Sequence, residues 1–191
     1  MHTVGTPAPG HDIRLIDDQG IELAPGSTGE IVGHSEGIMT GYHNQPAKTA
    51  EAEWYDPTGK RFIRTGDVGR FDEDGFLILM DRKKDMIISG GFNVYPSDLE
   101  AVLLGHADVA EAAVVGVPSE RWGETPVAFV VPKRHDPQLS KTLLEWTNSQ
   151  VGKTQRLAAI ELVDSLPRSA IGKVLKRELR DAYREKALAL S

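Results

Sequence analysis

Short apolar stretches alternate with turn-forming polar segments through the first 82 residues of the chain. The apolar stretches read DIRLID, GEIVG, RFIRTG and GFLILM, and the turn-forming segments read DDQG, APGSTG, DPTGK and DEDG. Glycine and Asp/Asn residues supply the positive backbone φ that tight turns require. The pattern therefore predicts short strands joined by turns, and we expect this part of the chain to be mostly β-structure.

Strands and helices alternate from about residue 85 onward. Apolar runs predict three strands, which read VAEAAVVGV, TPVAFVV and AAIELV. Residues at helical spacing predict two helices, one through Leu139, Leu143 and Trp146, and one after Gly172 through Leu175, Leu179 and Tyr183. We expect this second part to fold as a compact domain in which helices flank a short sheet.

A further short helix is predicted over residues 98–104. Ser97 with Glu100 three residues later is typical of a capping box, in which each side chain satisfies a backbone N–H group of the first turn. Pro96 precedes this box, and Gly105 provides a helix end. With these elements the predicted fold class is α+β, a β-rich segment followed by a small mixed α/β domain.

A run of charged residues marks the predicted boundary between the two parts. The run MDRKKD, residues 80–85, follows the last β-type stretch and precedes the first helical pattern. Charge runs of this kind are usually solvated connectors, which is the simplest interpretation of the run taken alone.

Composition narrows the class of protein. The chain has 191 residues, of which 40% are hydrophobic and 26% charged, as in ordinary globular proteins. Its formal net charge of −6 argues against a surface built to hold nucleic acid or anionic membrane. The absence of cysteine excludes disulfides, thiolate metal sites and thiol nucleophiles. With no apolar run of transmembrane length and no leader pattern, we expect a cytoplasmic protein.

Several short motifs are better explained as turns than as sites. PGSTGE, residues 25–30, lacks the lysine of a phosphate-binding loop and leads into a predicted strand. DEDG, residues 72–75, has the start of a calcium loop without its closing glutamate, so we expect a hairpin turn. The six histidines are scattered with no metal-ligand spacing, and we predict no metal site within the chain.

Three segments contain residues that are suited to binding or catalysis, but each is weak evidence when taken singly. Asp67 in RTGDVG can present two acceptor oxygens to a pair of vicinal hydroxyls. Gly90 and Gly91 in ISGGFNVYP permit close approach of the backbone to another segment or to a narrow ligand. Lys173 in PRSAIGK lies near the predicted start of the last helix, where it is either a solvated charge or an anion-binding group.

Taken in order, the motifs are more specific than any one of them. RTGD is followed by DRKKDMIISGGFNVYPSDLE, then WGETPVAFVV and then LPRSAIGKVLKREL, with GYHNQPAKT upstream. This series resembles the adenylate-forming superfamily of acyl-CoA synthetases, luciferases and peptide-synthetase adenylation domains, over nearly the whole chain. The double glycine and NVYP are more similar to the acyl-CoA synthetase branch.

The resemblance implies a domain division and a nucleotide site. Residues 1–82 match the distal β-rich part of the large N-terminal domain, residues 83–84 the hinge, and residues 85–191 the C-terminal domain. Asp67 matches the aspartate that holds the ribose hydroxyls of ATP and AMP, and Arg82 the arginine that also contacts the nucleotide.

The resemblance also implies roles for residues on either side of the hinge. Lys84 matches the hinge residue itself, about which the small domain rotates. Gly90 and Gly91 match the loop that lines the pantetheine tunnel of CoA, and Lys173 matches the catalytic lysine of adenylation. The family pattern is not complete, because Ala170 and Ile171 stand where relatives often carry Thr or Ser.

The implied reaction is the joining of a carboxylic acid to CoA, with ATP converted to AMP and pyrophosphate. Mg²⁺ would accompany the nucleotide, with its ligands outside this chain. The phosphate loop, the adenine segment and the carboxylate pocket of the family belong to the large N-terminal domain, so we expect the 191 residues alone to be inactive. Two alternatives stay open: an enzyme that loads a carrier protein, and a non-catalytic binding module. The acid and the oligomeric state are not predicted.

Overall fold

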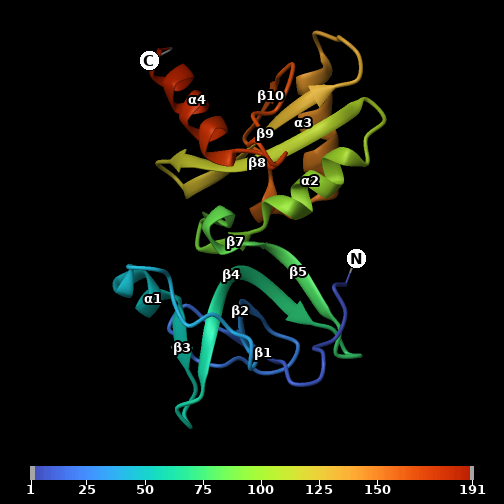
Figure 1. Ribbon diagram of the computed structural model, residues 1–191. Helices are drawn as coiled ribbons and strands as arrows, with labels where there is room; N and C mark the ends of the chain where they lie inside the picture. Colours follow the sequence, from blue (N-terminus) through green and yellow to red (C-terminus); the bar gives the residue numbers. More distant parts are fainter. Residues whose placement is uncertain (1–2, 190–191) are drawn as a thin grey trace. The chain divides into compact units, whose positions relative to one another are not determined.

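The structure is a computed structural model that describes residues 3–189, and Figure 1 shows its elements. The chain divides into two compact units, Met1–Lys84 and Asp85–Ser191. Each unit has a five-stranded sheet of its own. None of the helices in the described part of the chain is long and apolar enough to span a bilayer.

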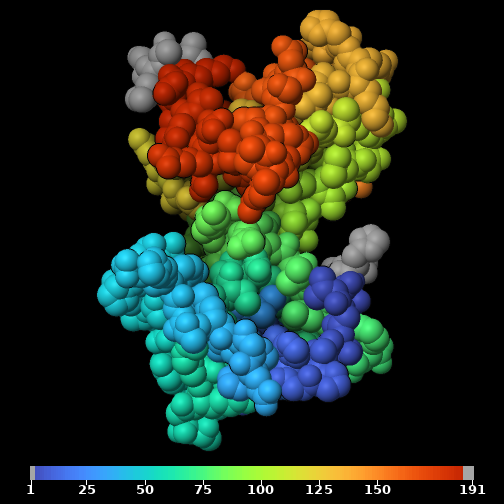
Figure 2. Space-filling model, in the orientation of Figure 1, coloured from blue at the N-terminus to red at the C-terminus, as the bar shows by residue number. Residues whose placement is uncertain are grey.

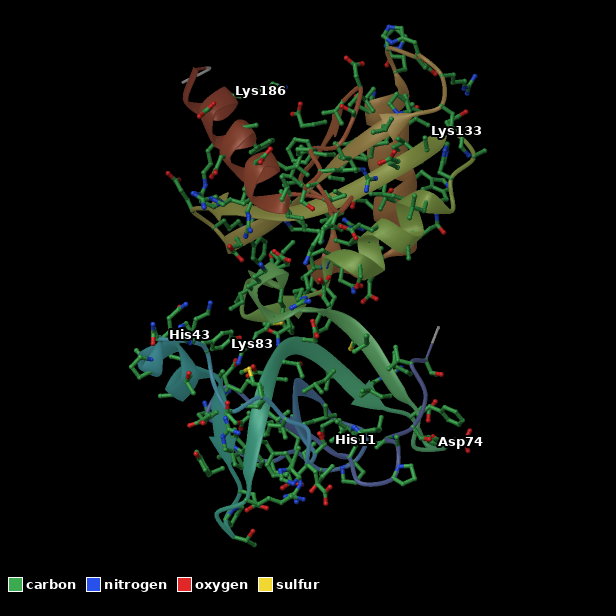
Figure 3. The ribbon with its side chains drawn as sticks, viewed as in Figure 1. His11, His43, Asp74, Lys83, Lys133 and Lys186 are labelled. Atoms are coloured by element: carbon green, nitrogen blue, oxygen red, sulfur yellow. The ribbon has the colours of Figure 1, made fainter. Side chains whose placement is uncertain are left out.

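The first unit is built on the long strand β4. Its elements are β1 (Asp12–Ile16), β2 (Thr28–His34), α1 (Pro46–Ala52), β3 (Glu53–Tyr55), β4 (Arg61–Phe71) and β5 (Leu77–Arg82). All strand pairs are antiparallel, in the order β1-β2-β4-β3. Strand β5 also pairs with β4, near the end opposite to β3, through the hairpin turn that contains Asp74 (Figure 3).

Aromatic packing and a charged cluster fix the first unit. Phe62 on β4 is fully buried and packs edge-on against Trp54 of β3, with ring centroids 5.1 Å apart. Arg14 on β1 covers the Phe62 ring and also binds Asp12. The Arg14 guanidinium, together with the Lys60 ammonium 2.8 Å from the carboxylate, lowers the pKa of Asp12 to about 2. These contacts hold β1 to the start of β4.

The second unit is organised around the β8–β9 hairpin. Its elements are β6 (Ile87–Ser89), β7 (Phe92–Val94), α2 (Pro96–Leu104), β8 (Val109–Ser119), β9 (Gly123–Pro132), α3 (Leu139–Gln150), β10 (Ala159–Leu162) and α4 (Lys176–Ala189). Strand β8 runs antiparallel to β9, whereas β10 runs parallel to it. Strand β6 meets β9 at the single pair Ser89–Gly123 and pairs along its length with β7. The sheet is therefore mixed.

Both faces of this second sheet are buried. Val114 and Val130 face helices α2 and α3, while Val115 and Phe129, one residue away on each strand, pack against Leu179 of α4. Alternate residues of a strand point to opposite faces, so a strand covered on both faces must be apolar throughout. This explains the nearly continuous apolar runs of β8 and β9. The α+β fold class, with its short sheet flanked by helices, is confirmed.

One predicted helix start is wrong. Helix α2 begins at Pro96, with Tyr95 as its N-cap residue, so Ser97 lies inside the helix and not at the N-cap position that a capping box requires. Proline is favoured at the first helical position because its missing N–H group would be unpaired there anyway. The Glu100 carboxylate instead accepts the Val114 N–H group at 2.8 Å.

The last helix also begins later than predicted. Helix α4 starts at Lys176, so Lys173 lies in the preceding loop and not in the helix. The cause is a local β-type pairing: Arg168 pairs with Val174, and the Leu175 N–H group donates to the Pro167 carbonyl. This pairing keeps Val174 and Leu175 outside the helix. Helix α1 and strands β3, β6 and β7 were not predicted.

Candidate active site

Asp67 lies in an irregularity of strand β4. Residues 65–67 lie opposite the single residue Ile31 of β2, because the pairing register shifts by two on β4 at this point. The Thr65 hydroxyl donates to the Ile31 carbonyl at 3.0 Å and accepts the Asp67 N–H group at 3.1 Å, and Gly66 has a φ of +73°. A bulge of this kind re-aims a side chain without unfolding the strand.

The structure brings Asp67 and Arg82 together. They are cross-strand partners on β4 and β5, and Arg82 Nε lies 2.8 Å from Asp67 Oδ1. Their side chains are 30% and 48% exposed, so both reach solvent. A guanidinium has five N–H groups and a carboxylate four acceptor positions, so this ion pair leaves capacity on both partners for a polyhydroxylated or anionic ligand.

Two consecutive lysines follow β5, of which Lys83 is held by ion pairs and Lys84 is solvated. Lys83 (Figure 3) lies 3.0 Å from the buried Glu30 carboxylate and 2.9 Å from Asp18. Burial lowers the pKa of Lys83, but the two carboxylates outweigh it and hold this pKa above its usual value. Lys84, the predicted hinge residue, is exposed and makes no ion pair with any described residue. Both lysines belong to a short 3₁₀ turn, Lys83–Asp85.

Gly90 and Gly91 form the two-residue turn between β6 and β7. Their φ values are +58° and +83°, as a tight hairpin turn of this hand requires. A Cβ atom on Gly90 would lie 2.9 Å from Cε3 of Trp122, whereas one on Gly91 would meet nothing within 4 Å. Gly90 is therefore packed against the protein, and Gly91 faces open space.

A pocket of about 410 Å³ adjoins this turn. Its lining residues are Ser89, Phe92, Trp122, Thr125, Lys153, Thr154, Arg156, Leu157 and Ala158. Phe92 and Trp122 are 59% and 47% exposed, and the side chains of Lys153 and Arg156 are also exposed. Sequence reasoning missed this pocket, because its aromatic and basic residues are some thirty positions apart and no spacing rule connects them.

Lys173 sits on a tight loop fixed by backbone bonds. The Ser169 N–H group donates to the Lys173 carbonyl, and the Gly172 N–H group donates to the Ser169 carbonyl, both at 2.8 Å. The Lys173 N–H group donates to Ser169 Oγ at 3.2 Å, and Gly172 has a φ of +81°. The Lys173 side chain is exposed, and its ammonium has no ion-pair partner within residues 3–189. The loop lies at the surface of the second unit, in the orange-red segment of Figure 2.

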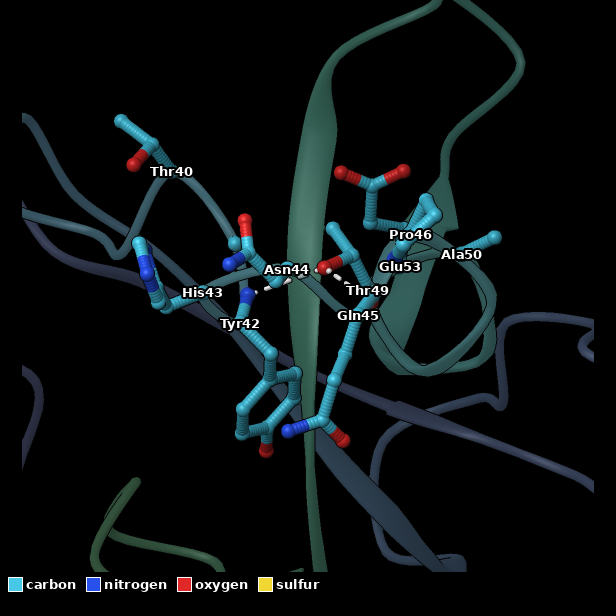
Figure 4. A pocket seen from close by; sticks show the side chains of 10 residues that line it. Thr40, Tyr42, His43, Asn44, Gln45, Pro46, Thr49, Ala50 and Glu53 are labelled. Carbon is cyan, nitrogen blue, oxygen red and sulfur yellow. Dashed lines mark hydrogen bonds between the residues drawn. The ribbon is translucent and has the colours of Figure 1, made fainter.

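A second cavity, of about 570 Å³, lies in the first unit (Figure 4). It is formed by the GYHNQPAKT segment, where Thr49 Oγ1 accepts the Tyr42 N–H group and donates to the Gln45 carbonyl. It contains none of the predicted site residues. In the described part of the chain, no group of three His, Cys, Asp or Glu side chains could hold a metal ion.

The fold agrees with the comparisons with known proteins. Residues 98–173 match the AMP-binding enzyme C-terminal domain. Residues 98–173 therefore form an AMP-binding enzyme C-terminal domain, and the structural neighbours that match nearly the whole chain are adenylate-forming enzymes.

Among its relatives is a fatty acid–[acyl-carrier-protein] ligase of Streptomyces coeruleorubidus, 43% identical over 96% of this chain and 34% of the relative. A long-chain-fatty-acid–CoA ligase of Escherichia coli O157:H7 is 40% identical over 96% of this chain and 32% of the relative. The crystal structure of ATP-bound MatB from Rhodopseudomonas palustris is 35% identical, covers 95% of this chain and 35% of its own, and has a TM-score of 0.86. The chain thus spans about a third of the length of these relatives.

The hydrogen bonds of the loop that carries Lys173, residues 167–175 (the lysine loop), predict an uneven pattern of amide hydrogen exchange. The amides of Ser169, Gly172 and Leu175 donate to backbone carbonyls, so we expect them to exchange at least about tenfold more slowly than those of Ala170 and Ile171, which have no acceptor among the described residues. Hydrogen–deuterium exchange resolved to single residues measures this on the 191-residue chain. Uniformly fast exchange over residues 169–175 would show that the loop is not preformed.

Proposed function

We propose that this chain is the C-terminal portion of an acid–thiol ligase that forms acyl-CoA from a carboxylic acid, ATP and CoA. The observation that carries the proposal is Lys173, an exposed lysine without an ion-pair partner among the described residues, mounted on a bonded loop at the end of the matched family domain. The relatives named above are ligases of fatty acids, and one related structure contains ATP.

In this proposal Lys173 acts in the first half-reaction. A carboxylate oxygen bonds to the α-phosphorus of ATP, and the bond from that phosphorus to pyrophosphate breaks. Both reactants are anions, so an ammonium between the carboxylate and the α-phosphate oxygens lowers their repulsion and orients them. A lysine suits this task because it is a compact charge on a long stem and its loop already fixes its backbone.

The remaining site residues have roles in binding and rotation. Asp67 and Arg82, paired on neighbouring strands, hold the ribose hydroxyls and contact the nucleotide. Mg²⁺ accompanies the triphosphate, bound by groups outside this chain. Lys84 is the hinge about which the second unit rotates between half-reactions, and the Gly90–Gly91 turn then lines the path of the pantetheine arm.

The pocket beside Gly90 favours CoA over a carrier protein as the thiol partner. Phe92 offers an exposed ring on which an adenine can stack, whereas the Arg121 guanidinium already lies over the Trp122 ring, 4.7 Å from its centroid. Lys153 and Arg156 offer positive charge for phosphates. CoA carries an adenine nucleotide with a 3′-phosphate, whereas a carrier protein presents pantetheine without one. One observation supports the carrier-protein alternative, because one relative is a ligase that acts on an acyl-carrier protein.

A non-catalytic binding module is the alternative from another class. Ile88 and Phe92 are 52% and 59% exposed, which an interaction surface would also require. Concentration-dependent association of the 191-residue chain, with no catalysis by any longer form, would favour it. In either case we propose that the 191 residues alone are inactive, since they match only a third of each relative and contain no glycine-rich phosphate loop.

The complete ligase with Lys173→Ala tests the proposal. We expect carboxylate-dependent ATP–pyrophosphate exchange to fall by about 10²- to 10³-fold, as for loss of one group that stabilises transition-state charge. Thioester formation from preformed acyl-adenylate should be unchanged, because the lysine serves only the first step. Arg177→Ala is the matched control, since Arg177 is 89% exposed and its ion-pair partner is Asp181 on its own helix.

The same assay with the 191-residue chain alone is the negative control, which we expect to give no pyrophosphate release. An exchange rate in Lys173→Ala within a few-fold of the unmodified ligase would refute the catalytic role. An equal fall in both half-reactions would point to damage of the fold instead.

The position of Arg156 in the pocket predicts that it recognises the nucleotide part of CoA. Arg156→Ala in the complete ligase should raise KM for CoA by about tenfold, the effect expected from loss of one charge-assisted bond to a phosphate. KM for phosphopantetheine, which lacks the nucleotide, should not change, and neither should pyrophosphate exchange. Steady-state thioester formation with the two thiols measures this. Equal changes for the two thiols would contradict a nucleotide site in this pocket.

A further inference from the structure

A single arginine connects the lysine loop to the central hairpin of the second unit. Arg168 Nη1 donates to the Gly172 carbonyl at 2.7 Å, and its Nη2 donates to the Glu111 carboxylate of β8. The guanidinium is planar, so the two bonds leave it in fixed directions. We infer that Arg168, held by Glu111, is a positioning residue for Lys173, an inference that rests on the catalytic role proposed above.

The two bonds on the Gly172–Lys173 peptide explain how Arg168 could act. The Gly172 carbonyl accepts from Arg168, and the Lys173 N–H group of the same peptide donates to Ser169 Oγ. A peptide unit is planar, so bonds at its two ends fix the orientation of the whole plane. That plane leads directly into the Cα atom of Lys173 and sets the direction in which its side chain leaves the loop.

The anchor for this arrangement is firm. Glu111 lies on β8 opposite Val131 of β9, beside an irregularity in the pairing between Val109 and Glu111, and from Glu111 the hairpin is paired without interruption to Ser119–Gly123. On either side of the loop, Leu166 and Leu179 are buried and pack in the same cluster as Phe129. The two ends of the segment are therefore fixed by packing, and Arg168 fixes its exposed middle.

Arg168 and Glu111 are not needed for the core. Their side chains are 45% and 44% exposed, and ion pairs at such positions contribute little to stability. A pair that contributes little to folding but holds the backbone next to a catalytic group is suited to positioning. Replacing Arg168 should therefore leave the fold intact and change the direction in which Lys173 points.

The test is a double-mutant cycle in the complete ligase. Arg168→Met should lower kcat for carboxylate-dependent ATP–pyrophosphate exchange by roughly ten- to a hundredfold, the size expected for a misplaced catalytic group. KM for ATP should change little, because Lys173 keeps its charge and the nucleotide is held elsewhere. In the Lys173→Ala background the same substitution should cause no further loss.

Further variants separate positioning from a structural effect. Arg168→Lys keeps the charge and should recover part of kcat, and Glu111→Gln should lower kcat in the same direction as Arg168→Met but by less. Arg177→Met is the matched control, because it removes an exposed arginine ion pair from the following helix and should leave kcat unchanged. In the 191-residue chain, Arg168→Met should speed amide exchange at Ser169 and Lys173 and not in β8.

The outcomes are distinguishable. If Arg168→Met lowers kcat for pyrophosphate exchange by the same factor with and without Lys173, the positioning role is overturned. It is also overturned if Arg168→Met leaves kcat unchanged while Lys173→Ala abolishes pyrophosphate exchange. If Lys173→Ala itself leaves exchange intact, the proposed function of the lysine fails, and the inference fails with it. The residual pyrophosphate exchange of Lys173→Ala can be too slow for the double-mutant cycle. In that case, unaltered amide hydrogen exchange at residues 169–173 in Arg168→Met overturns the inference.

Discussion

The second unit depends on the pairing of β8 with β9. These strands are hydrogen-bonded from Val109–Pro132 to Ser119–Gly123, and both of their faces are buried. The turn of Gly90 and Gly91 is attached to the start of β9 through Ser89, and the lysine loop is attached to β8 through Glu111. One rigid hairpin thus supports both segments to which we assign chemistry.

A free ammonium group distinguishes Lys173 from Lys83 and Lys176. Lys83 is bound by Glu30 and Asp18, and Lys176 lies 2.8 Å from Glu100, so these ammonium groups are engaged in holding elements together. The Lys173 ammonium has no such partner within residues 3–189, while its backbone is bonded on both sides. A fixed backbone with a free charge is what an electrostatic catalyst requires.

Sequence patterns predicted the longer strands and helices whose apolar faces are buried, since hydrophobic burial decides those elements. They missed the three-residue strands β3, β6 and β7, which are too short for a periodic pattern although each has a buried residue. They failed where one specific contact decided the outcome. Glu100 matched a capping box, but Pro96 set the helix start and the carboxylate bonded Val114. Lys173 was assigned near a helix start because local pairing of Arg168 with Val174 has no periodic signal. The paired positions of Asp67 and Arg82 follow from a strand register that includes a bulge, which sequence alone does not supply.

The central claim is that a positive charge at position 173 drives adenylation. The 191 residues contain no cysteine, so Lys173→Cys introduces a single thiol into this part of the proposed ligase. Treatment with 2-bromoethylamine converts it to an aminoethyl cysteine that restores an ammonium at nearly the lysine's length, whereas iodoacetamide adds a neutral group. The account predicts that carboxylate-dependent pyrophosphate exchange is lost in Lys173→Cys and returns only with bromoethylamine. Full exchange before modification, or equal recovery with both reagents, would contradict it.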